Sequence, residues 1–268
     1  MLKTSVIVPV YNERDYLERN LEALLKQTKP IDQIIVIDNN SSDGSVQSAR
    51  KKFKTVTFLE EKQQGLVFAR NTGFAACDGD ILIKIDGDTI TDPLWHETLV
   101  NDFEARKCDA WTGYVMTSEL NSLGRPVVGL LNLLSHRINP VFLGCDTVLG
   151  TNMAMTKESW EAIKPELYMR NDIFEDVDIS IELSNKNKTI YTQKKKLVHV
   201  SARSANATPR QFWRRTRGLN RQLHARKMHA RAFAIGALEL FVFLTWLVAR
   251  PLTFFGKKVN ERPNPDQN

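Results

Sequence analysis

The stretch GDILIKIDGDTIT, residues 79–91, decides the fold of this chain. An apolar run at residues 81–85 is followed by two aspartates that flank one glycine, Asp86-Gly87-Asp88. An Ile-rich run of this length predicts a strand that is buried on both faces of a parallel sheet. Ligands of open α/β sheets bind beyond the carboxyl ends of such strands, where paired carboxylates suit Mg²⁺ or Mn²⁺. Taken alone, the motif also fits a solvated Asp-Gly turn.

Strand-like and helix-like segments alternate through the first ninety residues. The expected strands are residues 5–10, 33–38, 56–59 and 81–86, and the expected helices are residues 15–27, 45–53 and 65–77. This alternation predicts right-handed βαβ crossovers and a parallel sheet.

Downstream of Pro93 the pattern becomes mixed. Helices are expected at residues 94–106, 127–138, 157–163 and 174–186, strands at residues 110–117, 189–192 and 197–201, and a strand with a turn at residues 147–156. The predicted fold class is therefore α/β, with a Rossmann-like, mostly parallel sheet that continues into a mixed second half.

Polar loops follow three of the predicted strands, at residues 11–13, 38–40 and 86–88. In a doubly wound sheet these loops share one edge, so their acids converge there. Converging carboxylates require a cation, and a cation at that edge suits a nucleoside diphosphate. No G-x-G-x-x-G follows the first strand and the chain lacks G-x-x-x-x-G-K-[ST], which argues against a dinucleotide enzyme and a P-loop NTPase.

Four motifs in this order resemble the signature of family 2 glycosyltransferases with the GT-A fold: VIVPVYNE (6–13), VIDNNSSDGS (36–45), GLVFARNTG (65–73) and DGD (86–88). The resemblance covers roughly residues 4–205. It implies an inverting, metal-dependent transferase that moves one sugar from a nucleotide-diphosphate sugar to a hydroxyl acceptor. It favours a UDP-linked donor and a divalent cation, Mg²⁺ or Mn²⁺, as the cofactor.

The resemblance also implies donor-side roles. Nucleotide-sugar contacts are expected from Pro9, Tyr11, Glu13, Asp38, Asn40, Arg70 and Asp86. Asp38 would accept a hydrogen bond from the base, and the planar fork of Arg70 suits a diphosphate or ribose. Asp88 would be the firmer metal ligand, Asp86 would face the ribose or the metal, and His199 would be a third ligand. For His199 a packed core position is the alternative.

On the acceptor side, the pair Glu175-Asp176 resembles the family's Glu-Asp pair. Asp176 is the predicted general base, which takes the proton from the acceptor hydroxyl, and Glu175 supports it. Gly150 and Asn152 resemble a small-residue turn that lines the acceptor. Favourable charge at a helix start is the alternative explanation for these acids and for Asp178.

One motif departs from the processive members of the family. Those enzymes carry Gln-x-x-Arg-Trp on an acceptor-side helix, whereas this chain has Gln211-Phe212-Trp213-Arg214-Arg215. A single transfer is therefore favoured over polymerisation.

The C-terminal part of the chain is strongly basic. Between Glu182 and Glu239 there are fourteen Lys and Arg residues and no acid, while the formal net charge of the whole chain is only +6. Such asymmetry predicts a polyanionic partner, either a membrane surface or nucleic acid. Residues 209–231 read as a basic amphipathic helix of the membrane-surface type. A solvated helix that covers the sheet is the alternative.

Residues 232–249 are apolar except for Glu239, and Arg250-Pro251 ends the run. A helix of this length spans about 27 Å, just short of the ~30 Å hydrocarbon core. Glu239 is costly in a lipid-exposed span, so spanning, lying in the interface and dimerisation all stay open. By the positive-inside rule, the basic flank before this helix is expected to stay cytoplasmic.

The expected organisation is a GT-A domain at residues 1–205, with a nucleotide half at 1–92 and an acceptor half at 93–205. A basic segment at 206–231, an apolar membrane-associated helix at 232–256 and a disordered tail at 257–268 follow. The N-terminus runs directly into a strand, with no signal peptide, and Cys77, Cys108 and Cys145 suggest a reducing compartment. The expected location is the cytoplasmic face of the cell membrane, as a peripheral or single-span protein.

The expected acceptors include lipid-linked and cell-envelope glycans, and no nucleic-acid partner is expected. A nucleotidyltransferase and a non-catalytic sugar-nucleotide binder are the alternative functions. A nucleic-acid-binding protein is a third alternative, but it leaves the acidic constellation unexplained.

Overall fold

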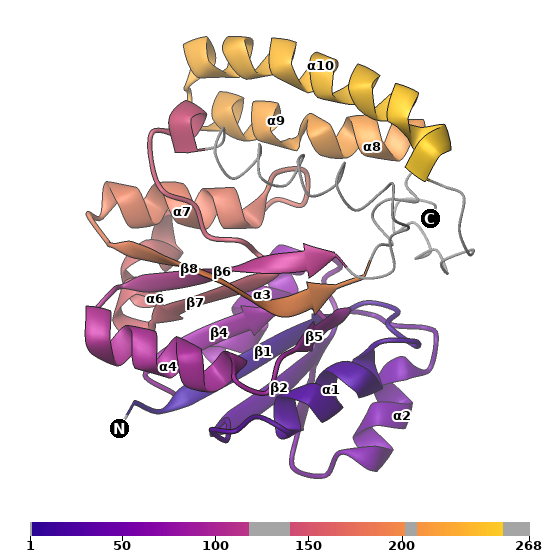
Figure 1. Ribbon diagram of the computed structural model, residues 1–268, viewed down its shortest axis with the longest axis vertical. Coiled ribbons are helices and arrows are strands. Elements are labelled where there is room, and N and C mark those ends of the chain that lie inside the picture. The colour runs from indigo at the N-terminus through magenta and orange to yellow at the C-terminus, as the bar shows by residue number, and fades with distance from the viewer. Residues whose placement is uncertain (1, 118–139, 202–207, 254–268) are drawn as a thin grey trace.

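The computed structural model describes residues 2–117, 140–201 and 208–253, the last six of these by their backbone alone (Figure 1). The expected helix at 127–138 and the expected tail at 257–268 lie outside the described residues. The described strands form one eight-stranded sheet, in the spatial order β3 (Thr57–Glu60), β2 (Gln33–Asp38), β1 (Thr4–Val10), β4 (Ile81–Ile85), β7 (Asn152–Thr156), β6 (Ala110–Thr117), β8 (Ile190–Val200) and β5 (Thr89–Thr91).

The first half of the chain confirms the predicted βαβ winding. Strands β1 to β4 are parallel, and they are connected through α1 (Leu17–Leu25), α2 (Ser45–Lys52) and α3 (Leu66–Ala75). The chain moves outward from β1 to β3 and then crosses back to place β4 on the other side of β1. The order therefore reverses beside β1, and such a switch point is where ligands bind in open α/β sheets.

Alternating side chains divide the core into two layers. Val6 and Val8 of β1 pack with α1, α2 and α4 (Trp95–Arg106), whereas Ile7 packs with α3, α6 (Lys157–Ile163) and α7 (Glu175–Asn185). All five residues of β4 are buried, as its Ile-rich sequence predicts. Each buried Val, Leu or Ile contributes about 1.5–3 kcal/mol through the removal of its surface from water.

The second half is mixed, as expected. β7 is antiparallel to β4 and β6, β5 is antiparallel to β8, and β8 is parallel to β6. The two short strands expected at 189–192 and 197–201 are wrong, because the structure has the single strand β8. Gly113 pairs with Gln193 but Val115 pairs with Val198, so a bulge takes up Lys194–Lys196, which are exposed. At the bulge these three lysines have no pairing partner in β6, and the regular pairing resumes at Val198.

The single basic helix expected at 209–231 is also wrong. The structure divides it into α8 (Pro209–Thr216) and α9 (Gly218–Ala225), and α10 (His229–Thr253) follows. The break lies at Arg217, whose ψ of −3° departs from helical geometry. Gly218 is pressed against Phe174, since a Cβ there would lie 2.7 Å from the aromatic ring. The helix is therefore interrupted at Arg217, and α9 packs on the body of the protein.

The C-terminal helices form a layer of their own. α10 lies along α8 and α9 at one end of the molecule, and α7 lies between this layer and the sheet (Figure 1). Leu219 and Leu223 of α9 pack with Val177 and Ile181 of α7 and with Ile235 of α10. This cluster fixes the layer onto the helix that carries the predicted catalytic acids.

Candidate active site

The polar loops after β1, β2 and β4 meet at one edge of the sheet, as predicted. The backbone N–H of Asn39 donates to the carbonyl of Val10 at 2.8 Å, and the N–H of Ser42 donates to Oδ1 of Asn12 at 2.8 Å. The loop after β4 reaches the same place, because a Cβ on Gly87 would lie 3.1 Å from Cγ of Glu13. The switch point beside β1 is therefore lined by three acidic or amide-rich loops.

Most of the predicted nucleoside contacts lie along this edge. Pro9 is buried in β1 opposite Ile37, Tyr11 is half-buried, Glu13 is 1% exposed, Asp38 is half-buried and Asn40 is exposed. Oδ1 of Asp38 accepts a hydrogen bond from the N–H of Ser41 at 2.8 Å. Their contacts to a nucleotide stay predictions.

Asn39 was not singled out from the sequence, yet it organises this edge. Its buried amide donates to the carbonyls of Glu61 and Gln63 at 2.9 and 2.8 Å, and its Oδ1 accepts from the N–H of Gly65 at 2.7 Å. It thus fastens the β2 loop to the start of α3. A run of two asparagines after a strand was the available signal, but only burial separates the inward Asn39 from the exposed Asn40.

The Asp86-Gly87-Asp88 motif has the chemistry of a magnesium or manganese site. The side chain of Asp86 is 30% exposed, and Oδ2 of Asp88 accepts a hydrogen bond from Ser201 at 2.6 Å. Within the described residues no group of three His, Cys, Asp or Glu side chains gathers as a metal site. One or two carboxylates completed by substrate phosphates and water are, however, the usual way in which proteins hold Mg²⁺. The residues present therefore fit a cation that arrives with a diphosphate.

His199 was predicted as a third ligand of that cation. It lies in β8, opposite Ile90 of β5 and Met116 of β6, and it is half-buried. Ser201, two residues later, is the residue whose hydroxyl reaches Asp88. Metal ligation by His199 stays a prediction.

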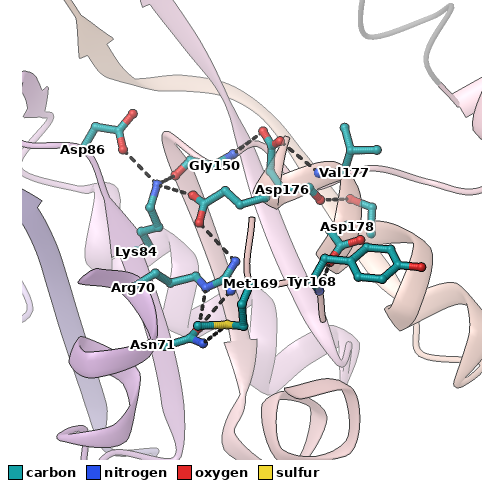
Figure 2. A network of polar contacts seen from close by, with 12 residues as sticks. Arg70, Asn71, Lys84, Asp86, Gly150, Tyr168, Met169, Asp176, Val177 and Asp178 are labelled. Carbon is teal, nitrogen blue, oxygen red and sulfur yellow. Dashed lines mark hydrogen bonds and ion pairs between the residues drawn. The ribbon is translucent and has the colours of Figure 1, made fainter. Parts of the chain in front are cut away.

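Lys84 is the functional candidate that the sequence analysis did not assign. Its side chain is fully buried, and Nζ lies 2.9 Å from Oδ1 of Asp86, 2.5 Å from the carbonyl oxygen of Gly150 and 3.0 Å from Oε1 of Glu175. Figure 2 shows Lys84 reaching toward both Asp86 and Gly150. The carboxylates of Asp86 and Glu175 outweigh the effect of burial and raise the pKa of Lys84 above its usual value.

The available signal for Lys84 was a single charge inside an apolar strand. Charged side chains are almost never fully buried unless they are paired. A lysine in a strand buried on both faces therefore predicts an acidic partner, although the sequence cannot name it.

Arg70 lies beneath the same carboxylate. Its side chain is 1% exposed, and Nη1 lies 3.1 Å from Oε2 of Glu175, while Nε and Nη2 donate to Oδ1 of Asn71. Its guanidinium also covers the ring of Trp160 at 5.4 Å. The contact with a diphosphate or ribose stays a prediction, and in this structure the residue serves as the buried partner of Glu175.

The predicted base, Asp176, is held at the first turn of α7. Its Oδ2 accepts a hydrogen bond from the N–H of Gly150 at 2.9 Å, and its Oδ1 accepts one from the N–H of Val177 at 2.9 Å. Burial raises the pKa of the Asp176 carboxyl, and the hydrogen bond from Gly150 opposes that rise. A raised pKa suits a group that must accept a proton near neutral pH.

The acids at the start of α7 diverge rather than act as one cap. Glu175 points to Lys84 and Arg70, Asp176 points to Gly150, and Asp178 turns to the opposite side, where it accepts hydrogen bonds from Gln222 and Arg226. Simple charge at a helix start therefore does not account for all three.

Asn152, predicted on the acceptor side, is 1% exposed. Its Oδ1 accepts from the indole of Trp95 at 3.0 Å, and its Nδ2 donates to the carbonyl of Gly113 at 3.1 Å. These bonds fix the start of β7, and with it the turn that contains Gly150. The predicted acceptor contact itself stays a prediction.

Sequence comparison identifies a family and several relatives of this chain. A family model described as glycosyl transferase family 2 matches residues 5–162. The chain is 37% identical over 118 residues to glycosyltransferase AglE of Haloferax volcanii, covering 41% of this chain and 38% of that protein. It is 31% identical over 99 residues to an undecaprenyl-phosphate 4-deoxy-4-formamido-L-arabinose transferase of Proteus mirabilis, covering 34% of this chain and 30% of that protein. The matched part is thus only about a third of the length of these relatives.

Solved structures with the same fold cover more of the chain. A mannosyltransferase from Pyrobaculum calidifontis, solved with GDP-Man and Mn²⁺, has a TM-score of 0.68 at 19% identity and covers 96% of this chain and 76% of that chain. A glucosyl-3-phosphoglycerate synthase from Mycobacterium tuberculosis, solved with Mn²⁺, UDP and phosphoglyceric acid, has a TM-score of 0.59 at 18% identity, covering 86% and 78%. The predicted fold class is confirmed.

Proposed function

The chain belongs to glycosyl transferase family 2, and from that premise we propose that it transfers one sugar from a nucleoside-diphosphate sugar to a hydroxyl acceptor with inversion at the anomeric carbon. The single observation that carries this proposal is the juxtaposition of two sets of acids. Asp86 and Asp88 follow the central strand β4 at the switch point, and Asp176 is held on Gly150, whose carbonyl shares Lys84 with Asp86. A diphosphate side and a base side thus adjoin one another.

The chemistry of the proposed step divides between these two sides. Asp176 accepts the proton of the acceptor hydroxyl while that oxygen attacks the anomeric carbon and the bond to the nucleoside diphosphate breaks. Asp86 and Asp88 would hold a divalent cation, which as a Lewis acid neutralises the charge of the leaving diphosphate. The burial that raises the pKa of Asp176 makes its carboxylate a stronger base.

For the donor base, uridine is our proposal. Among the structural neighbours one was solved with GDP-Man and another with UDP, so the fold accommodates either nucleoside. The decisive experiment is calorimetric titration of UDP and GDP, with and without Mn²⁺. We expect UDP to bind more tightly, to require the cation, and to lose most of its affinity in Asp88→Ala.

Asp78→Ala is the matched control for this titration. Asp78 lies at the amino end of β4, is largely exposed and pairs with Lys3, so its removal should leave nucleotide binding unchanged. Binding of GDP in preference to UDP would correct the donor. Absence of binding by either nucleotide would overturn the transferase proposal.

We also propose that the protein associates with a membrane surface through α10. Residues 229–247 are long and apolar enough for a membrane span, yet only 22% of that window is buried. Phe233 and Phe241 are 86% and 64% exposed, with Leu240, Leu244 and Leu247 on the same helix also exposed. An exposed apolar helix face of this size marks an interaction site.

The orientation of α10 favours lying in the interface over spanning. Glu239, the acid that makes a span costly, is 4% exposed and accepts a hydrogen bond from the N–H of Asn220 at 3.0 Å. It therefore faces α9 and not the lipid. Because α8 and α9 pack along α10, a spanning α10 would carry their arginines into the hydrocarbon, at about 2.5–3.5 kcal/mol each.

Flotation with vesicles tests this placement. We expect the protein to float with vesicles that contain anionic phosphatidylserine, to be released by alkaline carbonate, and to lose binding in the Phe233→Glu/Phe241→Glu variant. Leu25→Glu, at an exposed leucine of α1 in the body of the protein, is the control and should bind as wild type does. Resistance to carbonate would favour a span instead.

A further inference from the structure

We propose that Lys84 is a positioning residue that ties the cation-binding carboxylate of Asp86 to the turn that holds the base. This proposal rests on the proposed transferase function, which assigns no step to Lys84. The ammonium group donates hydrogen bonds to Oδ1 of Asp86 and to the carbonyl of Gly150, and it forms an ion pair with Oε1 of Glu175 at 3.0 Å. The side chain is 0% exposed, so water does not compete for these contacts.

Gly150 connects Lys84 to Asp176. Its carbonyl accepts from Lys84 at 2.5 Å, and its own N–H donates to Oδ2 of Asp176 at 2.9 Å. A Cβ at this position would lie 3.2 Å from Oδ2 of Asp176, so the backbone approaches the carboxylate as closely as a glycine allows. The place of the base therefore depends on Lys84 through the two polar groups of one residue.

Neutralising Glu175 does not explain Lys84. Arg70 already pairs with Oε2 of Glu175 at 3.1 Å, with both side chains buried. Lys84 adds two contacts that Arg70 does not make, one with Asp86 on the diphosphate side and one with the Gly150 turn on the base side. It is thus the one ion-paired lysine among the described residues that joins the diphosphate side to the base side.

Two effects of opposite sign follow from this arrangement. Without Lys84, the Gly150 turn and Glu175 lose an anchor, and a misplacement of about 1 Å at the base costs on the order of 10²-fold in turnover. A positive charge beside Asp86 also repels a divalent cation, so its removal strengthens cation binding. If Lys84 served only general packing, its removal would instead weaken turnover and cation-dependent nucleotide binding together.

The test is the Lys84→Met variant, which replaces the apolar part of the side chain with an unbranched one of similar length, removes the ammonium group and leaves the Arg70–Glu175 pair intact. Donor turnover is measured as release of the nucleoside diphosphate from the nucleotide-sugar that wild type uses fastest. Binding of UDP with Mn²⁺ is measured by calorimetry, and folding by thermal unfolding. We expect kcat to fall about 100-fold, while the Mn²⁺-dependent affinity for UDP equals or exceeds that of wild type.

The matched control is Lys188→Met. Lys188 also pairs with two acids, Asp109 at 3.1 Å and Glu158 at 2.9 Å, but at a distance from the site along the chain and in the fold. Its kcat and its UDP affinity should match those of wild type. Combining Lys84→Met with Glu175→Gln supplies a second readout, because residues that act through one another give a smaller combined loss than the product of the single losses.

The outcomes separate this proposal from the proposed function. If wild type turns over the donor and Lys84→Met keeps the same kcat, the role of Lys84 is overturned. Parallel losses of kcat and UDP affinity in Lys84→Met would overturn it as well. Neither result would contradict the proposed function. If wild type neither binds nor turns over a nucleotide-sugar, both proposals fall. If Lys84→Met does not fold, Lys84→Arg keeps the charge and alters the geometry. We then expect a lower kcat at unchanged UDP affinity, and a wild-type kcat would contradict the proposal.

Discussion

Two buried charge clusters each include acids of α7: Glu175 belongs to one, and Asp178, three residues later, belongs to the other. They differ in whether one of their carboxylates is accessible to solvent. The site cluster consists of Arg70, Lys84, Asp86 and Glu175, and the anchor cluster consists of Asp178, Glu182, Gln222 and Arg226. Each contains an arginine over an aromatic ring, Arg70 at Trp160 and Arg226 at Tyr168. Composition therefore does not distinguish them.

Accessibility does distinguish them. In the anchor cluster Arg226 is 12% exposed and pairs with Asp178 and Glu182, which are 2% and 4% exposed, so every charge is enclosed. In the site cluster the outermost carboxylate, Asp86, is 30% exposed and faces the edge where the three loops meet. A buried ion pair alone does not mark function, whereas a buried network that ends in an accessible carboxylate does.

The anchor cluster also explains part of the basic C-terminal arm. Arg226 pairs with Asp178, and Arg221 pairs with the carboxylate of Asp172 at 3.8 Å and donates a hydrogen bond to the backbone carbonyl of that residue at 2.7 Å. Some of the positive charge that predicted a polyanionic partner is therefore used to hold α9 on α7.

The largest expected effect comes from Asp176→Asn, at the base that Gly150 connects to the site cluster. Loss of the base should lower kcat by about 10²–10⁴-fold, while UDP affinity stays that of wild type. Because burial disfavours the charged carboxyl, the unfolding free energy at pH 7 should be unchanged or higher. Steady-state kinetics and chemical denaturation measure the two effects, and a variant with normal kcat would remove Asp176 from the site.

Arg226→Met should produce the opposite pattern. Removing one partner of a buried charge network costs about 3–5 kcal/mol of unfolding free energy, because Asp178 and Glu182 remain buried without their cation. Activity per folded molecule should stay near wild type. Arg210→Met, at an exposed arginine of α8, is the control for loss of charge and should leave the unfolding free energy unchanged. A loss of kcat in folded Arg226→Met would show that the anchor cluster also serves catalysis.

The pH dependence sharpens the assignment of Asp176. The base must be charged, so kcat/KM should fall about tenfold per pH unit below its pKa, and the fall should begin above pH ~4, the ordinary range for aspartate. The raised pKa also means that this group's contribution to the unfolding free energy is greatest at low pH. That contribution is lost as the pH rises through the folded-state pKa. A pH profile of kcat/KM between pH 4 and 8 checks the sign, and a limb at or below pH ~4 would contradict it.

Gly150→Ala should have the smallest effect. Its Cβ would lie 3.2 Å from Oδ2 of Asp176, so the carboxylate must move by a few tenths of an ångström. We expect a loss of kcat below the ~10²-fold of a 1 Å misplacement, with little change in thermal stability. Gly236→Ala, in α10, is a glycine control away from the site: its Cβ would lie 3.3 Å from the amide nitrogen of Asn220, and kcat should stay unchanged.

Much of the fold could be predicted because its signals are local. Strands 33–38 and 110–117 and the helix at 157–163 have the bounds expected from apolar patterning. Patterning failed where distant packing decided the outcome. Phe174 sets the break before Gly218, and pairing with β6 makes one strand of residues 190–200.

The sequence by itself determined the parallel sheet, the meeting of three polar loops at its edge, and the two aspartates that follow β4. The physical reason is that apolar periodicity and strand order are properties of the chain read locally. Only the tertiary structure decided that Lys84 is shared by Asp86, Gly150 and Glu175, and that Asp178 of α7 accepts a hydrogen bond from α9. Gly150 and Glu175 lie 66 and 91 residues from Lys84 along the chain, and Gln222 lies 44 residues from Asp178 on a separate helix. Burial makes each contact strong by excluding the water that would otherwise screen it.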